Sequence, residues 1–169
     1  MAADQIIVVT GAGHSAGLEA YAPYSYRDDP AVPGFPDDLQ LIVFDGVCVL
    51  CNGFARFVAK RDADKRFRFA EAQSAVGGAL FRHYGLDDVN YETNLLIQDG
   101  RAYGRMEAFV QIVSQLGGAW PCVRAVLLLP RPLRNWLYER IARNRYALFG
   151  RYETCPVHRD AAIAQRLIG

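Results

Sequence analysis

The sequence predicts one α/β domain in which short strands alternate with helices. A chain of 169 residues suits a single domain, and its 51% hydrophobic content is ordinary for a globular protein. Short apolar or alternating runs between residues 41 and 103 are separated by longer segments with helical periodicity. Cys48 and Cys51 lie in CxxC spacing at the first junction between such a run and such a segment. These three observations indicate an α/β fold built around a cysteine pair.

The first two strands of the predicted core enclose its first helix. Residues 41–44 form an apolar run typical of a strand, and the turn-forming pair Asp45 and Gly46 ends it. A helix is expected at residues 49–61. Its predicted apolar face consists of Leu50, Phe54, Phe57 and Val58. Residues 67–70 alternate like a second strand. The cysteine pair therefore lies where a strand gives way to a helix.

Two more helices and two more strands complete the predicted core. Residues 73–84 have the pattern of a helix that Gly85 ends. Residues 93–98 and 101–103 are expected to form a hairpin, because the Asp-Gly pair between them favours a two-residue turn. The residues that mark a last amphipathic helix are Met106, Phe109, Val110, Val113 and Leu116. The order βαβαββα is that of a thioredoxin-like core.

Further helices are predicted beyond this core. Residues 120–129 and 132–149 both have helical patterns, and proline at position 132 suits the first turn of the second helix. The residues predicted to share one face of that helix are Leu133, Trp136, Leu137, Ile141 and Tyr146. We expect these C-terminal helices to cover one side of the core.

The first 38 residues differ in character from the rest of the chain. Residues 21–38 contain four prolines and four aspartates, and the frequent loss of backbone donors predicts that no regular element forms there. We therefore divide the chain into an extended N-terminal arm at residues 1–38, laid on the domain, and a thioredoxin-like domain with a C-terminal helical extension at residues 39–169.

Composition and charge exclude several classes of protein. A net charge of +1 and a pI near 7.7 give no reason to expect a nucleic-acid partner. The longest apolar stretch, residues 119–129, contains Arg124 and is well short of the ~20 residues that span a bilayer. The first residues lack the basic region and apolar core of a signal peptide, and four cysteines are too few for a secreted disulfide scaffold. We expect a cytoplasmic protein with no membrane insertion.

The CxxC pair has the spacing of a redox-active dithiol. Two thiols one helical turn apart can close a small disulfide, and the unpaired N–H groups at a helix N-terminus stabilise a thiolate on the first of them. Cys48 is nearer the helix end and is expected to be the more exposed thiol. The sequence therefore predicts that Cys48 attacks the substrate and that Cys51, one turn deeper, resolves the mixed disulfide.

Asp45 precedes Cys48 by three residues and is the third candidate site residue. It can accept or relay the proton that leaves Cys51 when the mixed disulfide resolves. It can equally form the turn by binding backbone N–H groups around the cysteines. A carboxylate beside Cys48 raises the pKa of that thiol, which opposes the effect of the helix end. A capping or relay role is therefore favoured over direct activation.

Several separated runs of this chain resemble the DCC family of predicted thiol-disulfide oxidoreductases. The runs that match in order are FDGVCVLCN (44–52), FRFAEAQS (67–74), PRPLR (130–134), ARNRY (142–146) and FGR (149–151). The resemblance covers roughly residues 40–157. It implies a thioredoxin-like fold, disulfide exchange and a site made of Asp45, Cys48 and Cys51. Counting back from the hairpin, Glu92 occupies the place where thioredoxins carry a cis-proline that faces the disulfide.

The reading favoured by these residues is a thiol-disulfide oxidoreductase that acts on a protein or a small thiol. The alternative is a non-catalytic module in which Cys48, Cys51, Cys155 and His158 hold zinc, or in which the aromatic C-terminal helix binds a partner. Cys155 is also a candidate third redox thiol. A glycine turn at residues 7–17 is typical of a dinucleotide-binding fold, but no helix–strand unit follows it, so no cofactor is expected.

Overall fold

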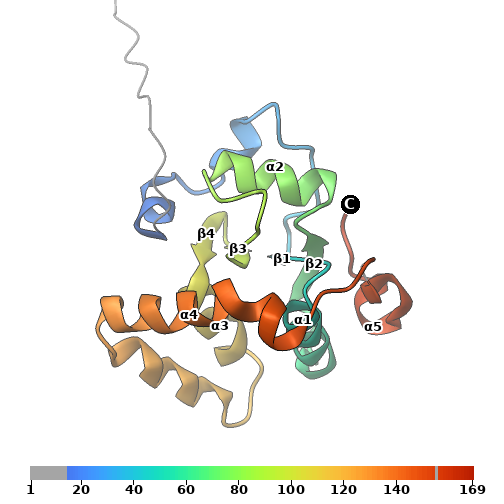
Figure 1. The fold of residues 1–169 in the computed structure, drawn as a ribbon. Helices are drawn as coiled ribbons and strands as arrows, with labels where there is room; N and C mark the ends of the chain where they lie inside the picture. Colours follow the sequence, from blue (N-terminus) through green and yellow to red (C-terminus); the bar gives the residue numbers. More distant parts are fainter. Residues whose placement is uncertain (1–14, 155) are drawn as a thin grey trace, which may run out of the picture.

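The computed structural model describes residues 15–154 and 156–169 and contains the predicted order of strands and helices (Figure 1). The core elements are β1 (Gln40–Phe44), α1 (Val49–Arg61), β2 (Phe67–Glu71), α2 (Ala75–His83), β3 (Leu95–Gln98), β4 (Arg101–Gly104) and α3 (Arg105–Ser114). The elements outside the core are the 3-10 helices η1 (Ser15–Ala20), η2 (Ser25–Asp28), η3 (Trp120–Leu128) and η4 (Pro156–Arg159), and the α-helices α4 (Arg131–Phe149) and α5 (Ala161–Ala164).

The four strands form one mixed sheet in the order β2-β1-β3-β4. β1 pairs in parallel with β2 and antiparallel with β3, and β3 pairs antiparallel with β4. The hairpin between β3 and β4 turns at Asp99 and Gly100, which both have positive φ as a type I′ turn requires. The predicted α/β fold with a thioredoxin-like core is confirmed.

Helices cover both faces of the sheet because the residues of β1 alternate between two apolar cores. Leu41 and Val43 point to the core beneath α2, whereas Ile42 and Phe44 point to the core beneath α1. All four side chains are buried. Figure 1 shows α2 on one side of the sheet, with α1, α3 and α4 on the other. The carboxyl end of β1 therefore delivers the chain to the layer that contains α1 and α4.

The described part of the N-terminal arm, residues 15–38, packs on the domain beside α2. Leu18 and Tyr26 are buried in the core beneath α2. The expectation that residues 21–38 hold no regular element is wrong at η2, a short 3-10 helix whose tight turns tolerate the flanking prolines. His83 at the end of α2 ties this arm down, with its Nδ1 atom 2.7 Å from Asp29 Oδ2. The glycine turn at residues 7–17 lies almost wholly outside the described residues.

The C-terminal tail joins the core on the α1 side. Val157 and Ile163 are fully buried there. Arg166 donates from Nη1 to Asp62 Oδ2 at 2.7 Å, and Leu167 pairs with Phe69 in a parallel bridge beside β2. The tail thereby adds a bridge at the β2 edge of the sheet and binds Asp62, the residue that caps the C-terminus of α1.

α4 packs with a different face inward from the one that its sequence predicts. Its buried residues are Arg134, Ala142 and Arg145. The predicted apolar face is largely exposed at Leu133, Trp136, Leu137 and Ile141. The prediction that this apolar face covers the core is therefore wrong at these four residues, and two of the three buried residues of α4 are arginines. Within residues 15–154 and 156–169, no helix is both long and apolar enough to cross a membrane.

Candidate functional site

Cys48 caps the N-terminus of α1, directly after the turn that ends β1. Its sulfur accepts a hydrogen bond from the backbone N–H of Cys51 at 3.2 Å, so the thiol takes the place of a capping oxygen. Asn52 holds the turn by donating to the carbonyl oxygens of Gly46, at 2.7 Å, and Cys48, at 2.8 Å. The local sequence thus places Cys48 at the positive end of α1.

The two sulfurs form one ionising unit. The thiol of Cys51 donates to the sulfur of Cys48 across 2.6 Å. That hydrogen bond, the Cys51 backbone N–H and the charge of Arg145 lower the pKa of Cys48 to about 7, against the opposing effect of burial. The same hydrogen bond, together with burial, raises the pKa of Cys51. The pair therefore loses one proton near neutral pH and resists losing the second, which would place two charges side by side.

Cys51 is more exposed than Cys48, which is the reverse of the sequence prediction. Cys48 is 0% exposed, while Cys51 is only half-buried. The prediction that Cys48 is the exposed thiol is wrong, because the segment after α4 covers it. Cys48 forms an isolated antiparallel bridge with Arg151, and the N–H of Tyr152 donates to the carbonyl oxygen of Val47 at 2.7 Å.

Asp45 is buried at the end of β1, where its carboxylate accepts four hydrogen bonds. Oδ1 accepts from the Val47 backbone N–H at 3.2 Å and from Gln73 Nε2 at 2.7 Å. Oδ2 accepts from Arg145 Nη2 at 3.0 Å and from the hydroxyl of Tyr146. The expected turn-forming role is confirmed by the bond to Val47. No carboxylate oxygen is left free of a donor, so protonation of Asp45 would break one of these bonds.

The residues that sequence reasoning missed are the partners of Asp45. Gln73, Arg145 and Tyr146 lie in two of the runs that resemble the DCC family, FRFAEAQS and ARNRY. Their presence in separate matching runs was the available signal, but no local spacing indicates that these runs meet Asp45. Arg145 Nη2 also donates to the carbonyl oxygens of Asn90, at 2.5 Å, and Tyr91, at 3.1 Å. One guanidinium therefore holds α4, the loop before β3 and the CxxC turn together.

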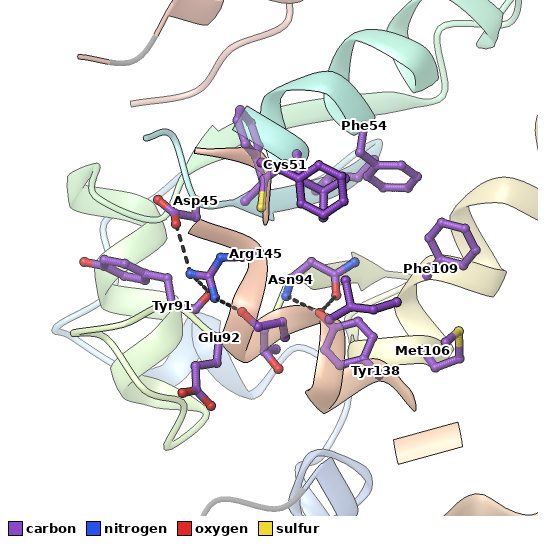
Figure 2. A pocket seen from close by; sticks show the side chains of 17 residues that line it. Asp45, Cys51, Phe54, Tyr91, Glu92, Asn94, Met106, Phe109, Tyr138 and Arg145 are labelled. Carbon is purple, nitrogen blue, oxygen red and sulfur yellow. Dashed lines mark hydrogen bonds and ion pairs between the residues drawn. The ribbon is translucent and has the colours of Figure 1, made fainter. Parts of the chain in front are cut away.

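A cavity of about 440 Å³ opens beside the pair, and Cys51 lies in its wall. Figure 2 shows the sulfur of Cys51 pointing into this pocket, between the Asp45 and Arg145 pair on one side and Phe54 and Phe109 on the other. Other apolar lining residues are Leu50, Met106, Ile141 and Phe149. Cys48 does not line the cavity. The reachable sulfur of the pair is therefore that of Cys51.

Glu92 and His158, which the sequence singled out, lie apart from the contact between the two sulfurs. Glu92 is exposed and lines the pocket, and the described residues contain no cis peptide bond. His158 lies with its Nε2 atom 2.7 Å from Glu71 Oε1. Among the described residues, no group of three or more His, Cys, Asp or Glu side chains is arranged to hold a metal ion. Cys155 lies outside those residues, so its expected roles as a zinc ligand or third redox thiol stay predictions.

Comparisons with known proteins identify the family to which the chain belongs. A family model described as DCC1-like thiol-disulfide oxidoreductase matches residues 42–151, a range that contains both cysteines, Asp45 and Arg145. The uncharacterized protein YuxK of Bacillus subtilis is 35% identical over 116 residues, which cover 69% of this chain and 85% of that protein. A chloroplastic DCC family protein of Arabidopsis thaliana is 35% identical over 122 residues, which cover 72% of this chain and 71% of that protein. No solved structure matches the chain significantly. The chain belongs to the DCC1-like thiol-disulfide oxidoreductase family.

Proposed function

We propose that this protein reduces or forms disulfides by exchange at Cys48 and Cys51. The observation that supports this proposal most directly is the contact between the two sulfurs, 2.6 Å apart at the N-terminus of α1, with one sulfur facing a cavity. Both cysteines are free thiols in this structure, so the dithiol is the form described here. Closing and reopening one bond between them transfers two electrons.

The ionisation of the pair supports a working nucleophile at neutral pH. A pKa of about 7 for Cys48 gives a substantial thiolate fraction in the cell, and a thiolate with a pKa near the ambient pH is the most effective attacking species. Because the thiol proton lies between sulfurs 2.6 Å apart, its transfer to Cys48 leaves the negative charge on Cys51. The lowered pKa of Cys48 and the raised pKa of Cys51 keep most of the charge on Cys48, so attack from the pocket uses the minor form in which the proton has crossed to Cys48.

The order of attack that we propose is therefore the reverse of the order expected from the sequence. Cys51 attacks one sulfur of the substrate disulfide, which forms a mixed disulfide and releases one thiolate. That thiolate takes up the proton held by Cys48. The sulfur of Cys48 then attacks Cys51, closes the protein disulfide and displaces the second thiolate, which takes a proton from solvent. A fully buried Cys48 suits this second, internal step, since only Cys51 must reach it.

Asp45 acts in this proposal as a positioning residue, not as a proton relay. Its four hydrogen bonds hold the turn before Cys48 against α4 through Arg145 and Tyr146. The charge of Arg145 lowers the pKa of Cys48, whereas that of Asp45 raises it. The ion pair thus limits the opposing effect of the carboxylate on the thiolate.

The proposal includes a reducing compartment, the cytoplasm, and a protein or low-molecular-weight disulfide as the partner. Four cysteines in 169 residues are too few for a secreted disulfide scaffold, which supports a compartment where thiols stay reduced.

The direct test is a titration of the purified protein in glutathione redox buffers, with the state of Cys48 and Cys51 read by mass after alkylation. A reversible two-electron transition roughly between −270 and −120 mV supports the proposal and indicates the direction of electron flow. Two thiols that stay reduced across this range, or a pair protected by zinc in the metal-analysed protein, would contradict it.

A further inference from the structure

The size and lining of the cavity beside Cys51 limit the class of substrate that can reach this sulfur. Its volume of about 440 Å³ lies within the range typical of small-molecule pockets. Phe54 of α1 and Met106 and Phe109 of α3 line one side, and Ile141 and Phe149 of α4 line another. The pocket is therefore a space between helices in which one wall holds a reactive sulfur and the others offer apolar surface.

Two pairs of polar groups in the pocket are engaged with one another, and the exposed carboxylate of Glu92 also lines it. The hydroxyl of Tyr138 donates to Asn94 Oδ1 at 2.9 Å and accepts from the Asn94 backbone N–H at 3.3 Å. Asp45 and Arg145 form their buried ion pair. Figure 2 shows these two polar pairs as separate contacts, with apolar side chains extending away from the sulfur of Cys51. A ligand that lies between the apolar side chains, away from Glu92, gains from apolar contact rather than from pairing with a charge.

The same geometry favours a small molecule over a protein loop. Cys48 is 0% exposed, and Cys51 meets the pocket beneath α4 instead of standing on an open surface. A disulfide within a folded protein would have to bring its flanking chain past α4 to reach this sulfur. A small disulfide can enter whole.

The geometry points to a low-molecular-weight disulfide with one uncharged apolar arm as the substrate, the arm lying in the pocket while its sulfur meets Cys51. This inference rests on the proposed function. The dithiol gives two electrons to the substrate, R–S–S–R′, and becomes the disulfide between Cys48 and Cys51. The products are the thiols RSH and R′SH: one takes the proton that the ionised pair still holds, and the other takes a proton from solvent, which received one when the pair ionised.

The test uses a series of 2-hydroxyethyl alkyl disulfides with ethyl, butyl and hexyl arms, because the leaving thiols have nearly constant acidity while the apolar arm grows. Reduced protein is mixed with each disulfide, and the second-order rate of its oxidation is measured over a single turnover. The rate should rise by about fourfold for each added methylene until the arm fills the pocket, which is the factor that corresponds to ~0.8 kcal/mol per methylene.

Ile141→Asp and Leu148→Asp form the matched pair of variants. Both residues lie on α4 and are exposed, but Ile141 lines the pocket and Leu148 does not. Ile141→Asp should flatten the dependence of the rate on arm length, and Leu148→Asp should keep it. The slope, unlike a single rate, is insensitive to a general effect of the new charge on the thiolate.

Calorimetry with 2-hydroxyethyl hexyl sulfide, a thioether that cannot exchange, separates this inference from the proposed function. If the thioether binds but no disulfide is exchanged, the pocket accepts an apolar arm as inferred and the proposed redox function is refuted. Exchange at a rate independent of arm length, with no thioether binding, would overturn the substrate assignment and keep the function. Faster oxidation by a disulfide-bonded peptide than by the hexyl disulfide would also overturn it, in favour of a protein substrate.

Discussion

Arg145 donates from Nη2 to Oδ2 of Asp45 at 3.0 Å, although the two residues are 100 positions apart in the chain. Their side chains are 5% and 1% exposed, so the ion pair is buried. A carboxylate in such a place needs a charged partner and further donors, because its hydration is lost. Arg145, with Tyr146 beside it, satisfies that need and holds α4 over the CxxC turn.

Replacing Arg145 should be strongly destabilising. Arg145→Met leaves the Asp45 carboxylate buried without its charged partner and should lower the free energy of unfolding by about 3–5 kcal/mol. Urea denaturation followed by circular dichroism measures this change. Arg143→Met is the control on the same helix, since Arg143 pairs with Glu139 at the surface and its loss should cost about 0.5 kcal/mol. Equal losses in the two variants would contradict the structural role of Arg145.

The two single cysteine variants should behave differently toward a disulfide substrate. Cys48→Ser should accumulate a mixed disulfide on Cys51, because attack proceeds and the internal resolving thiol is missing. Cys51→Ser should give little mixed disulfide, because Cys48 is fully buried. Intact mass spectrometry after acid quenching counts the adducts. Efficient trapping on Cys48 in the Cys51→Ser variant would restore the order predicted from the sequence and require the segment around Arg151 to open.

Alkylation of the reduced protein should depend on pH with a midpoint near 7. The pKa of Cys48 is lowered to about 7, so the pair carries its thiolate above that pH and is protonated below it. The rate of labelling by iodoacetamide should therefore fall about tenfold per pH unit below 7 and level off above it. Peptide mapping assigns the label, and a short unstructured peptide with one cysteine, whose ordinary thiol pKa is about 8.5, is the reference. A midpoint shared with the reference would show that the pair is not activated.

The C-terminal tail should contribute to stability although it lies beyond the matched range of residues 42–151. Ile163 is fully buried in the core beneath α1, so Ile163→Ala should lower the free energy of unfolding by about 2–5 kcal/mol. Leu148→Ala at an exposed position of α4 should change it by about 0.5 kcal/mol or less. Thermal or urea unfolding of both variants measures the difference. If Ile163→Ala changes the free energy of unfolding as little as Leu148→Ala does, the tail does not contribute to stability.

Two helical glycines should respond oppositely to alanine. A Cβ at Gly77 would collide with the carbonyl oxygen of Glu71, where α2 turns back on β2, so Gly77→Ala should be destabilising. A Cβ at Gly53 meets nothing within 4 Å, so Gly53→Ala should stabilise α1 by about 0.5–1 kcal/mol. Chemical denaturation of the two variants compares them directly. If both substitutions stabilise the protein, α2 can move away from the Glu71 carbonyl oxygen without a cost in stability.

The features that the sequence determined by itself are local. An apolar run, a turn at Asp45 and Gly46, and helical periodicity predicted β1 and α1, and α1 begins and ends at the predicted residues. The placement of Cys48 at the helix end follows from the same short stretch. The hairpin at Asp99 and Gly100 was predictable because its turn chemistry involves only those residues.

Only the tertiary structure decided which sulfur is reachable, what Asp45 binds and which side of α4 faces inward. Each of these depends on residues far apart in the chain: Arg151 covers Cys48, and Arg145 meets Asp45. The apolar pattern of α4 gave a wrong prediction of its buried face, because that prediction took the apolar side of a helix to be the buried one. Leaving a buried carboxylate unpaired is costlier than exposing residues such as Trp136, and so the donor-bearing side of α4 turns inward.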